Sequence, residues 1–315
     1  TYVKQAAQPL PYDPARDDMS VTRTINYEVP TGHEAIAPVT QTVEYTRDVN
    51  GVAGYQDPVA GKPTWNPWHV KSGKAEFAST SVEQIKGYDS YVDSTKATEV
   101  AAAAVTEKDG EPQNGATVTV TYTANEHTLV INYVDGNGTV VGTYNVPGKT
   151  DETVNVDVPG NVPTNWKLVP NQQVIGSYKF GSDDPQPVDY KVEHGTENVP
   201  VDKNNKDTYR KITQTIQEVP AGKTNADMTV VRTVSVEFKR TGVKDLVTSE
   251  ITWNAWQGPE GTVDKNGVPT YTISAYTITP QKGYDTYVNG VKNTDNQIPA
   301  VDVTADSQNI TDTIT

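Results

Sequence analysis

The chain of 315 residues holds 26 basic and 40 acidic side chains, which gives a formal net charge of −14 at pH 7. This excess of negative charge repels phosphate backbones and anionic lipid, so it disfavours nucleic acid and membrane surfaces as partners. Cysteine is absent, which excludes disulfides, thiolate metal sites and a cysteine nucleophile.

The length predicts about two or three domains, each with a modest core. No apolar run approaches the ~20 residues that span a bilayer, so we expect no membrane insertion. The N-terminus lacks the basic and apolar regions of a signal peptide, and we expect the sequence to be an excerpt from a longer chain.

The residue usage indicates β-structure. Tyr, at 17, outnumbers Phe, at 3, and Thr, Val, Gly and Pro recur in nearly every segment. Strands and turns favour these residues. Polar and apolar residues alternate with period two, which predicts strands at 117–122, 128–134, 231–238 and 270–277. There is no long amphipathic pattern, so we expect little helix.

Asn-Gly pairs predict tight turns between the strands, because Asn-Gly is the commonest type I′ hairpin dipeptide. They lie at 50–51, 114–115, 137–138, 266–267 and 289–290. Gly87 and Gly283 are each predicted to form a turn before a strand.

Three short motifs occur twice in the same order. They are EVPTG and EVPAG, TWNPW and TWNAW, and KGYDSYV and KGYDTYV, which begin at residues 28 and 218, 64 and 252, and 86 and 282. The period of roughly 190 residues is far above that of solenoid repeats, so the repeating object is domain-sized.

The segment between the two copies has no counterpart elsewhere and predicts a second kind of unit. We predict a larger module at 12–124, a smaller module at 125–195 and a second larger module at 196–315, with 1–11 as the end of a preceding module or linker. No Gly/Ser-rich linker separates them, so we expect limited bending at the junctions.

The second copy settles an ambiguity in the first. Residues 98–105 (TEVAAAAV) favour helix by alanine propensity. The matching segment 297–303 contains Pro299 and alternates at Val301 and Val303. Because proline removes an interior helical hydrogen bond, we predict extended structure for both segments.

The sequence lacks the signatures of catalysis. Its four histidines are His33, His69, His127 and His194. None has the spacing of a metal site, and there is no GxSxG, P-loop or GxGxxG motif. The recurring acids Asp89 and Asp285 have no recurring second carboxylate for glycoside hydrolysis. We therefore expect no enzyme, no catalytic residue, no metal ligand and no cofactor.

Three acidic segments share residues with calcium loops: the turns at 134–138 (VDGNG) and 263–267 (VDKNG), and Asp183-Asp184. They lack the twelve-residue ligand pattern that ends in a bidentate Glu. A hairpin turn is therefore favoured over a calcium site.

The duplicated aromatic motifs provide the candidate ligand-binding residues. They are Trp65, Trp68, Tyr88, Tyr91, Trp253, Trp256, Tyr284 and Tyr287. In a strand, residues i and i+3 point to opposite faces, so one indole of each pair points outward unless Pro67 bends the chain. We expect each copy to present one exposed Trp and one exposed Tyr. Sugar rings stack on such faces while polar neighbours bind the hydroxyls.

Packing is the alternative role for these aromatic residues. Small β-domains without disulfides need large side chains in their cores, and copying a domain copies its core. For any single Trp, packing within or between modules is favoured over ligand contact.

The motifs together resemble a known family. The EVPAG start, KGYDSYV with KGYDTYV, and IPAVDVTAD at 298–306 resemble the mucus-binding (Mub) repeats of cell-surface adhesins from lactic acid bacteria. The middle segment, from HTLVINYVDGNGTVVGTYNVPGK at 127–149 to VDYKVEHG at 188–195, resembles the smaller mucin-binding-protein (MucBP) domain. The resemblance covers essentially the whole chain.

That resemblance implies a mainly β fold of tandem ubiquitin-like β-grasp modules, arranged end to end as an elongated rod. It also implies the repeat region of a secreted, cell-wall-anchored adhesin of a Gram-positive bacterium, which binds mucin glycans through weak, multivalent sites. Immunoglobulin is a further implied partner, and we expect a monomer. The resemblance assigns no sugar-contact residue by position.

Two other functions remain open. In one, the modules form a passive stalk that presents another binding domain. In the other, they bind immunoglobulin or another protein by strand addition at an uncovered sheet edge.

Overall fold

The computed structural model describes residues 3–259 and 261–315, so Thr1 and Tyr2 of the predicted leading segment lie outside the described residues. Strand accounts for 48% of the chain and helix for 3%. The predicted mainly β fold with little helix is therefore confirmed, and the end-to-end arrangement of the modules stays a prediction. The chain divides into two compact units, residues 1–132, 142–161 and 173–190, and residues 133–141, 162–172 and 191–315.

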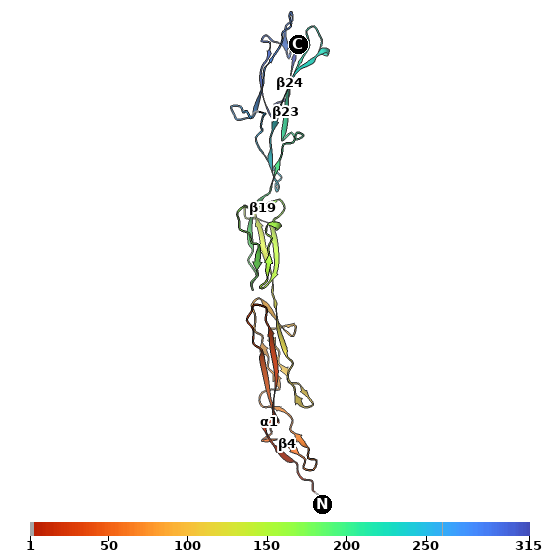
Figure 1. The fold of residues 1–315 in the computed structure, drawn as a ribbon, viewed down its shortest axis with the longest axis vertical. Helices are drawn as coiled ribbons and strands as arrows, with labels where there is room; N and C mark the ends of the chain where they lie inside the picture. Colours follow the sequence, from red (N-terminus) through yellow and green to blue (C-terminus); the bar gives the residue numbers. More distant parts are fainter. Residues whose placement is uncertain (1–2, 260) are drawn as a thin grey trace. The chain divides into compact units, whose positions relative to one another are not determined.

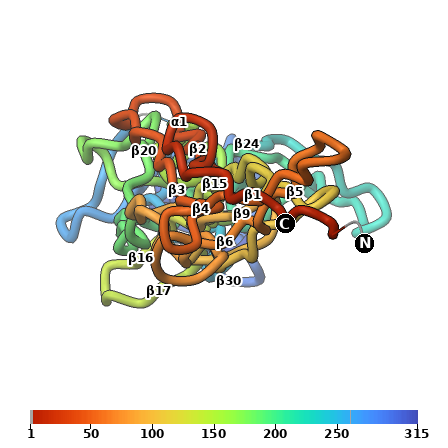
Figure 2. The backbone as a smooth tube through the Cα atoms, turned by 90° about the horizontal axis from the view of Figure 1, so that it is seen from below, coloured from red at the N-terminus to blue at the C-terminus, as the bar shows by residue number. Residues whose placement is uncertain are grey.

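The first larger module is built on a six-stranded sheet in the order β10-β9-β15-β2-β3-β6. Its strands are β2 (Asp18–Glu28), β3 (Val39–Thr46), β6 (His69–Val70), β9 (Tyr88–Val92), β10 (Thr95–Lys96) and β15 (Val118–Ala124). The first long strand, β2, is antiparallel to β3 and parallel to the last strand, β15. Figure 2 shows these three strands next to one another. This mixed sheet agrees with the predicted β-grasp.

A three-stranded sheet, β1-β4-β5, adjoins the start of this module and contains β1 (Gln8–Pro11), β4 (Val52–Gln56) and β5 (Pro63–Trp65). The helix α1 (Pro14–Asp17) connects β1 to β2 and is capped by the Asp13 carboxylate. Because β1 pairs with β4, residues 8–11 share a sheet with the first larger module. The module boundaries themselves stay predictions.

Short two-stranded ladders complete the first larger module. They are β7 (Glu76–Phe77) with β12 (Ala103–Ala104), β8 (Thr80–Ser81) with β11 (Glu99–Val100), and β13 (Glu107–Lys108) with β14 (Glu111–Pro112). Strands β11 and β12 lie in the alanine-rich segment 98–105, so its predicted extended structure is confirmed.

The smaller module contains a four-stranded sheet in the order β17-β16-β21-β19 and a two-stranded ladder, β18-β20. Its elements are β16 (Glu126–Val134), β17 (Val140–Lys149), β18 (Thr153–Asn155), the 3₁₀ turn η1 (Pro159–Asn161), β19 (Trp166–Leu168), β20 (Ser177–Lys179) and β21 (Val188–His194).

The second larger module repeats the plan of the first. Its main sheet has the order β24-β23-β33-β29-β30, beside the smaller sheets β22-β25-β26, β27-β32 and β28-β31. The strands of the first two sheets are β22 (Thr196–Val199), β23 (Tyr209–Glu218), β24 (Thr229–Lys239), β25 (Gly242–Asp245), β26 (Ile251–Trp253), β29 (Tyr287–Val288), β30 (Val291–Lys292) and β33 (Ile310–Ile314). The remaining elements are the 3₁₀ turn η2 (Asn225–Asp227), β27 (Thr270–Ile273), β28 (Tyr276–Thr277), β31 (Gln297–Ile298) and β32 (Val301–Thr304). Strands β23 and β24 run side by side (Figure 1), and β23 is parallel to β33.

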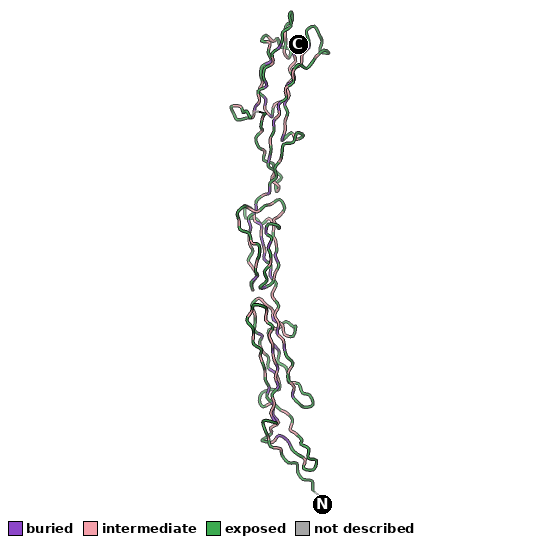
Figure 3. The backbone as a smooth tube through the Cα atoms, viewed as in Figure 1, coloured by how far each residue is buried: buried purple, intermediate pink, exposed green. Residues whose placement is uncertain are grey.

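The cores lie on the inward faces of the long strands, where buried positions concentrate in Figure 3. Ile25 of β2 packs with Val82, Val100, Val118 and Val120, while another cluster of the same module contains Val21, Val43, Tyr45 and Phe77. In the second larger module the clusters are Ile212, Val236, Phe238, Ile273, Val303 and Ala305, and Ile216, Ile278, Ile298 and Ile314. Alternation in the sequence thus fills several small cores.

The Asn-Gly turns are confirmed in part. Asn50 and Gly51, and likewise Asn289 and Gly290, all have positive φ, as a type I′ turn requires. The pair 114–115 is not a tight turn, so that prediction was wrong. The Asn114 side chain accepts a hydrogen bond from the Thr22 amide at 2.8 Å, and a Cβ at position 115 would lie 2.7 Å from the Phe77 ring.

The acidic turns compared with calcium loops use their carboxylates internally. Asp135 accepts from the amides of Asn137 and Thr139, both at 2.8 Å. In the second such turn, the Asp264 carboxylate accepts in the same way from the two amides at 266 and 268. The hairpin interpretation is confirmed at both turns.

We expect Ile25→Ala to lower the free energy of unfolding of the first larger module by about 2–5 kcal/mol, because it opens a cavity in a closely packed cluster. Differential scanning calorimetry would show a lower unfolding temperature for that module. The matched variant Ile216→Ala, at the equivalent buried position of β23, should lower the other larger module's transition instead. A shift of both transitions by either single change would contradict this.

Candidate ligand-binding sites

An arginine lies between the two tryptophans of the TWNPW motif. Arg47 follows the end of β3, and its guanidinium carbon lies 4.2 Å from the Trp68 ring centroid and 5.7 Å from that of Trp65. Arg16 of α1 covers Trp65 at 4.7 Å. A cation above an indole face is attracted by the electron-rich ring, so the arginines hold both rings in place.

An acceptor from β14 and a donor from the TWNPW motif close this arrangement. Glu111 of β14 accepts from an Arg47 terminal amino group and from the Trp68 Nε1–H, both at 2.7 Å. The Asn66 side chain donates to the Arg47 carbonyl at 3.1 Å. We call Arg16, Arg47, Trp65, Trp68 and Glu111 the first arginine–tryptophan cluster.

The second larger module contains the equivalent group, which we call the second arginine–tryptophan cluster: Arg210, Arg240, Trp253 and Trp256. The Arg240 guanidinium carbon lies 4.7 Å from the Trp253 ring centroid and 4.5 Å from that of Trp256. Arg210 also covers Trp256, at 5.2 Å. Asn254 donates its side-chain amide to Thr241 at 2.7 Å. The duplicated motif therefore builds the same object twice.

The predicted outward indole was wrong, because all four tryptophans are half-buried and each pair shares one arginine. Strand alternation does not extend across the motif, since β5 ends at Trp65 and β26 ends at Trp253. Proline is not the cause, because Ala255 replaces Pro67 without changing the arrangement. Trp68 and Trp256 also pack against core clusters.

Sequence reasoning missed the two central arginines. Arg47 and Arg240 come directly after β3 and β24, and each precedes its tryptophan motif. The loop lengths between arginine and motif differ between the copies, so a search for identical short words does not find them. Comparing the residue that follows the second long strand of each copy would have found both.

The tyrosines of the two copies differ in exposure. Tyr284 and Tyr287 are 60% and 37% exposed, whereas Tyr88 and Tyr91 are half-buried. The prediction of one exposed Tyr per copy is therefore wrong for the first copy. There the Tyr88 hydroxyl donates to Asp151 of the smaller module at 3.0 Å. Burial and this hydrogen bond raise the pKa of Tyr88.

Contacts to the smaller module surround Tyr88. Thr150 donates its hydroxyl to the Gly87 carbonyl at 2.8 Å, and His33 bonds Asp151 at 2.9 Å. The His33 and Tyr88 hydrogen bonds lower the pKa of Asp151. Gly87 has positive φ, as a turn before a strand requires, and a Cβ there would lie 2.7 Å from Thr150. The glycine thus also permits a close approach between two modules.

A second junction links the end of the smaller module to β25. The His194 Nδ1 lies 2.6 Å from an Asp245 carboxylate oxygen, and its ring meets Trp166 edge-on at 4.7 Å. Backbone amides of Thr248 and Val247 donate to the other carboxylate oxygen at 3.0 and 2.8 Å. The Thr248 amide, followed by His194, lowers the pKa of Asp245 to about 2.

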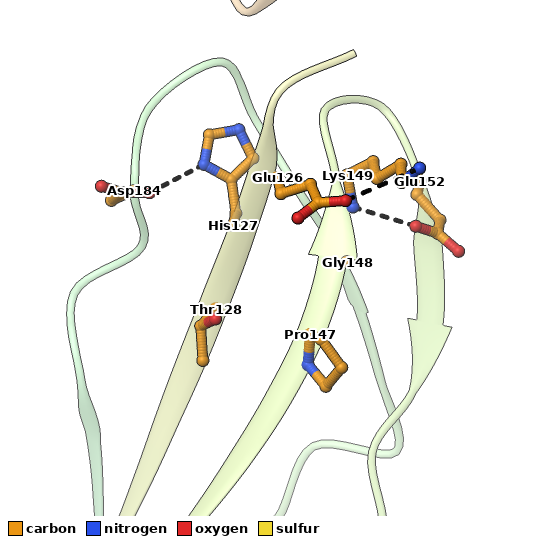
Figure 4. A pocket seen from close by; sticks show the side chains of 8 residues that line it. All are labelled: Glu126, His127, Thr128, Pro147, Gly148, Lys149, Glu152 and Asp184. Atoms are coloured by element: carbon orange, nitrogen blue, oxygen red, sulfur yellow. Dashed lines mark hydrogen bonds and ion pairs between the residues drawn. The ribbon is translucent and has the colours of Figure 1, made fainter.

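The smaller module has an open, polar depression of about 680 Å³. It is lined by Glu126, His127, Thr128, Pro147, Gly148, Lys149, Glu152 and Asp184. In Figure 4, His127 bonds Asp184 at 2.8 Å on one side, and on the other the Lys149 amide donates to Glu152 at 2.9 Å. Three carboxylates and no aromatic face make it a poor platform for a sugar ring.

The described residues, 3–259 and 261–315, contain no group of three or more His, Cys, Asp or Glu side chains placed to hold a metal ion. Over the same ranges, no helix has the length and apolar character to cross a membrane.

The sequence profile of the Muc B2-like domain matches residues 12–126 and 203–315, well over half of the chain. The chain belongs to the Muc B2-like domain family. Both arginine–tryptophan clusters lie in its Muc B2-like modules, and the smaller module lies between the two matches. The resemblance to Mub repeats seen in the sequence is confirmed.

Solved structures provide further likenesses. Mub-RV is 24% identical over 59% of this chain and 97% of its own, with a TM-score of 0.39. A type 2 repeat of the mucus binding protein MUB from Lactobacillus reuteri is 21% identical over 60% and 98%, with a TM-score of 0.35. A MucBP domain of the adhesion protein from Pediococcus pentosaceus is 29% identical over 34% and 99%, with a TM-score of 0.26. No curated protein sequence matches the chain.

We expect acid to open the turn that carries Asp245. Its pKa is about 2 in the folded chain and about 3.9 for an unperturbed aspartate. The carboxylate therefore contributes its full stabilisation above about pH 4 and loses it as the pH falls through about 2. Hydrogen exchange followed by NMR should show the amides of Val247 and Thr248 losing protection in that window.

The matched variant Asp245→Asn keeps an acceptor for these amides but does not titrate. Its protection at these two amides should stay constant across the same window. An equal loss of protection in the variant would show that another group controls the turn.

Proposed function

We propose that this chain is the repeat region of a bacterial cell-surface adhesin that binds host mucin through its glycans. The observation that carries the proposal is the arginine–tryptophan cluster built once in each Muc B2-like module. Half-buried indoles fixed by a cation leave part of their apolar surface exposed beside charged donors, and this combination suits a sugar ring with its hydroxyls.

Duplication supports weak, multivalent binding. Two modest sites on one chain bind a ligand that itself repeats, because the first contact raises the effective concentration for the second. A mucin carries many glycans along one polypeptide. Tyr284 and Tyr287 add exposed aromatic surface to the second Muc B2-like module. We propose the eight aromatic residues of the duplicated motifs as ligand contacts. Trp65 and Trp253 are the stronger candidates, because Trp68 and Trp256 pack against core clusters.

The proposal also covers the cellular location and the oligomeric state of the protein. We propose a secreted, cell-wall-anchored surface protein whose repeats act as a monomer without enzymatic activity. The negative net charge of −14 favours a partner other than an anionic polymer backbone, so local positive groups have to provide any attraction for acidic sugars.

Protein recognition is a second candidate, and one observation favours it. Strand β24 is eleven residues long and lies at the edge of its sheet, with Val230 59% exposed and Val231 37% exposed. A long edge strand with exposed valines can pair with an added strand from a partner such as immunoglobulin.

We expect this chain to bind immobilised mucin and to lose that binding when the mucin glycans are removed enzymatically. Surface plasmon resonance on treated and untreated mucin measures the difference. Binding that survives deglycosylation would support protein recognition through β24. No binding to either surface would leave the modules as a stalk.

We also expect the double variant Trp65→Ala, Trp253→Ala to weaken mucin binding at least about tenfold, a loss of about 1.4 kcal/mol. Trp166→Ala is the control, because this tryptophan lies in the smaller module, outside both clusters. The same loss in the control as in the double variant would contradict a specific role for the clusters.

A further inference from the structure

The two arginine–tryptophan clusters differ in the carboxylate that faces the central arginine and in the position of the second arginine. Arg16 covers Trp65 in the first cluster, whereas Arg210 covers Trp256 in the second. In the first cluster, Glu111 binds both Arg47 and the Trp68 indole N–H through its two oxygens. The remaining arginine, Arg16, is paired with Asp17 at 2.6 Å. Every arginine of the first cluster therefore has its own carboxylate, and the first cluster together with Asp17 carries no net charge.

The second cluster lacks this internal carboxylate at its centre. Asn114 and Asn309 accept from the amides of Thr22 and Thr213, which aligns the two copies. By that alignment Asp306 stands where the first copy has Glu111. However, Asp306 pairs with Arg210, at 2.6 Å, and not with the central arginine.

A substitution on the neighbouring strand explains this change of partner. The same alignment places Arg210 where the first copy has Met19, so the second copy has an additional arginine that takes up the local acid. Thr208 likewise replaces Asp17, since the carbonyl of each accepts from the amide of the central arginine. The second cluster therefore has two arginines, and Asp306 is the one carboxylate paired with them.

Among the described residues, the donors that correspond to those bound by Glu111 have no acceptor in the second cluster. Arg240 donates its Nε to the Asp207 carbonyl. Among residues 3–259 and 261–315, no carboxylate forms a salt bridge with Arg240, and the Trp256 indole N–H has no acceptor. Two adjacent donors, one of them cationic, are thus without an acceptor among residues 3–259 and 261–315.

We propose that the second arginine–tryptophan cluster binds the carboxylate of an acidic sugar. The ligand carboxylate takes the place that Glu111 takes in the first cluster, accepting from the Arg240 terminal amino groups and from the Trp256 Nε1–H. The sugar ring lies against the exposed edge of the Trp253–Trp256 pair. Charge-assisted hydrogen bonds of this type are about twice as strong as neutral ones. The inference rests on the proposed glycan binding and adds its chemical class.

The test uses the whole chain and three probes: glucuronate, glucose and N-acetylglutamate amide. NMR titration follows the indole Nε1–H signals, assigned by single Trp→Phe changes. We expect glucuronate to shift the Trp256 signal and to bind at least about tenfold more tightly than glucose. N-acetylglutamate amide, which offers a carboxylate without a sugar ring, should bind more weakly than glucuronate. Equal binding of this peptide analogue would overturn the assignment to a sugar.

Variants locate the site. Arg240→Gln should reduce glucuronate binding at least about tenfold, whereas Arg240→Lys, which keeps the charge, should reduce it less. The matched control is Arg232→Gln, because Arg232 also covers an aromatic ring, that of Tyr276, but lies outside both clusters. Glu111→Ala should create a second glucuronate site, seen as a new shift of the Trp68 signal.

Unchanged glucuronate binding in Arg240→Gln would overturn the inference, as would the absence of a new site in Glu111→Ala. A failure of this inference can be distinguished from a failure of the proposed function. If mucin binding depends on glycans but Arg240→Gln leaves it intact and glucuronate does not bind, the chain binds glycans by another site and only the inference fails.

Discussion

The parallel pairing of the first and last long strands organises each larger module. Strand β2 lies beside β15, and β23 beside β33, so both strands of a pair run in the same direction. Backbone hydrogen bonds between residues roughly ninety positions apart therefore form the centre of the sheet, and the flanking antiparallel strands attach to it. Each larger module consequently has one end at which its first long strand starts and an opposite end at which its last long strand finishes.

The positions of the candidate ligand-binding residues follow from this constraint. The arginine–tryptophan clusters lie at the start of the first long strand, because Arg47 and Arg240 come directly after the strands that pair with β2 and β23. The KGY tyrosines lie at the opposite end of the module, where Tyr88 pairs with Ala124 at the end of β15. At that end the first larger module contacts Thr150 and Asp151. These contacts explain why Tyr88 is covered whereas its counterpart Tyr284 is exposed.

The clusters show how a copied frame acquires different electrostatics. Both copies use an arginine between two indoles, which fixes the rings without a hydrophobic core on every side. One copy satisfies its arginine from within, through Glu111, whereas the other directs its acid to Arg210. The carboxylate that closes the first cluster is thus the group that, in our proposal, a ligand supplies to the second.

Much of the fold could be predicted from the sequence, because period-two alternation and the near-identical repetition of short motifs are local signals. The extended structure of 98–105 even followed from one proline in the other copy. The arginine at the centre of each cluster could not be found in this way, since its contact with the indoles depends on how two loops of different length pack. For the same reason the exposure of Tyr88 depends on a neighbouring module, which no pattern within KGYDSYV records.

A crystal structure of this chain with glucuronate would test the central claim most directly, namely that both clusters are one carboxylate-binding frame. We expect the ligand carboxylate to lie between Arg240 and the Trp256 N–H, with Glu111 still bound to Arg47 in the first cluster. Glucuronate bound elsewhere on the chain, or equally at both clusters with Glu111 displaced, would contradict it.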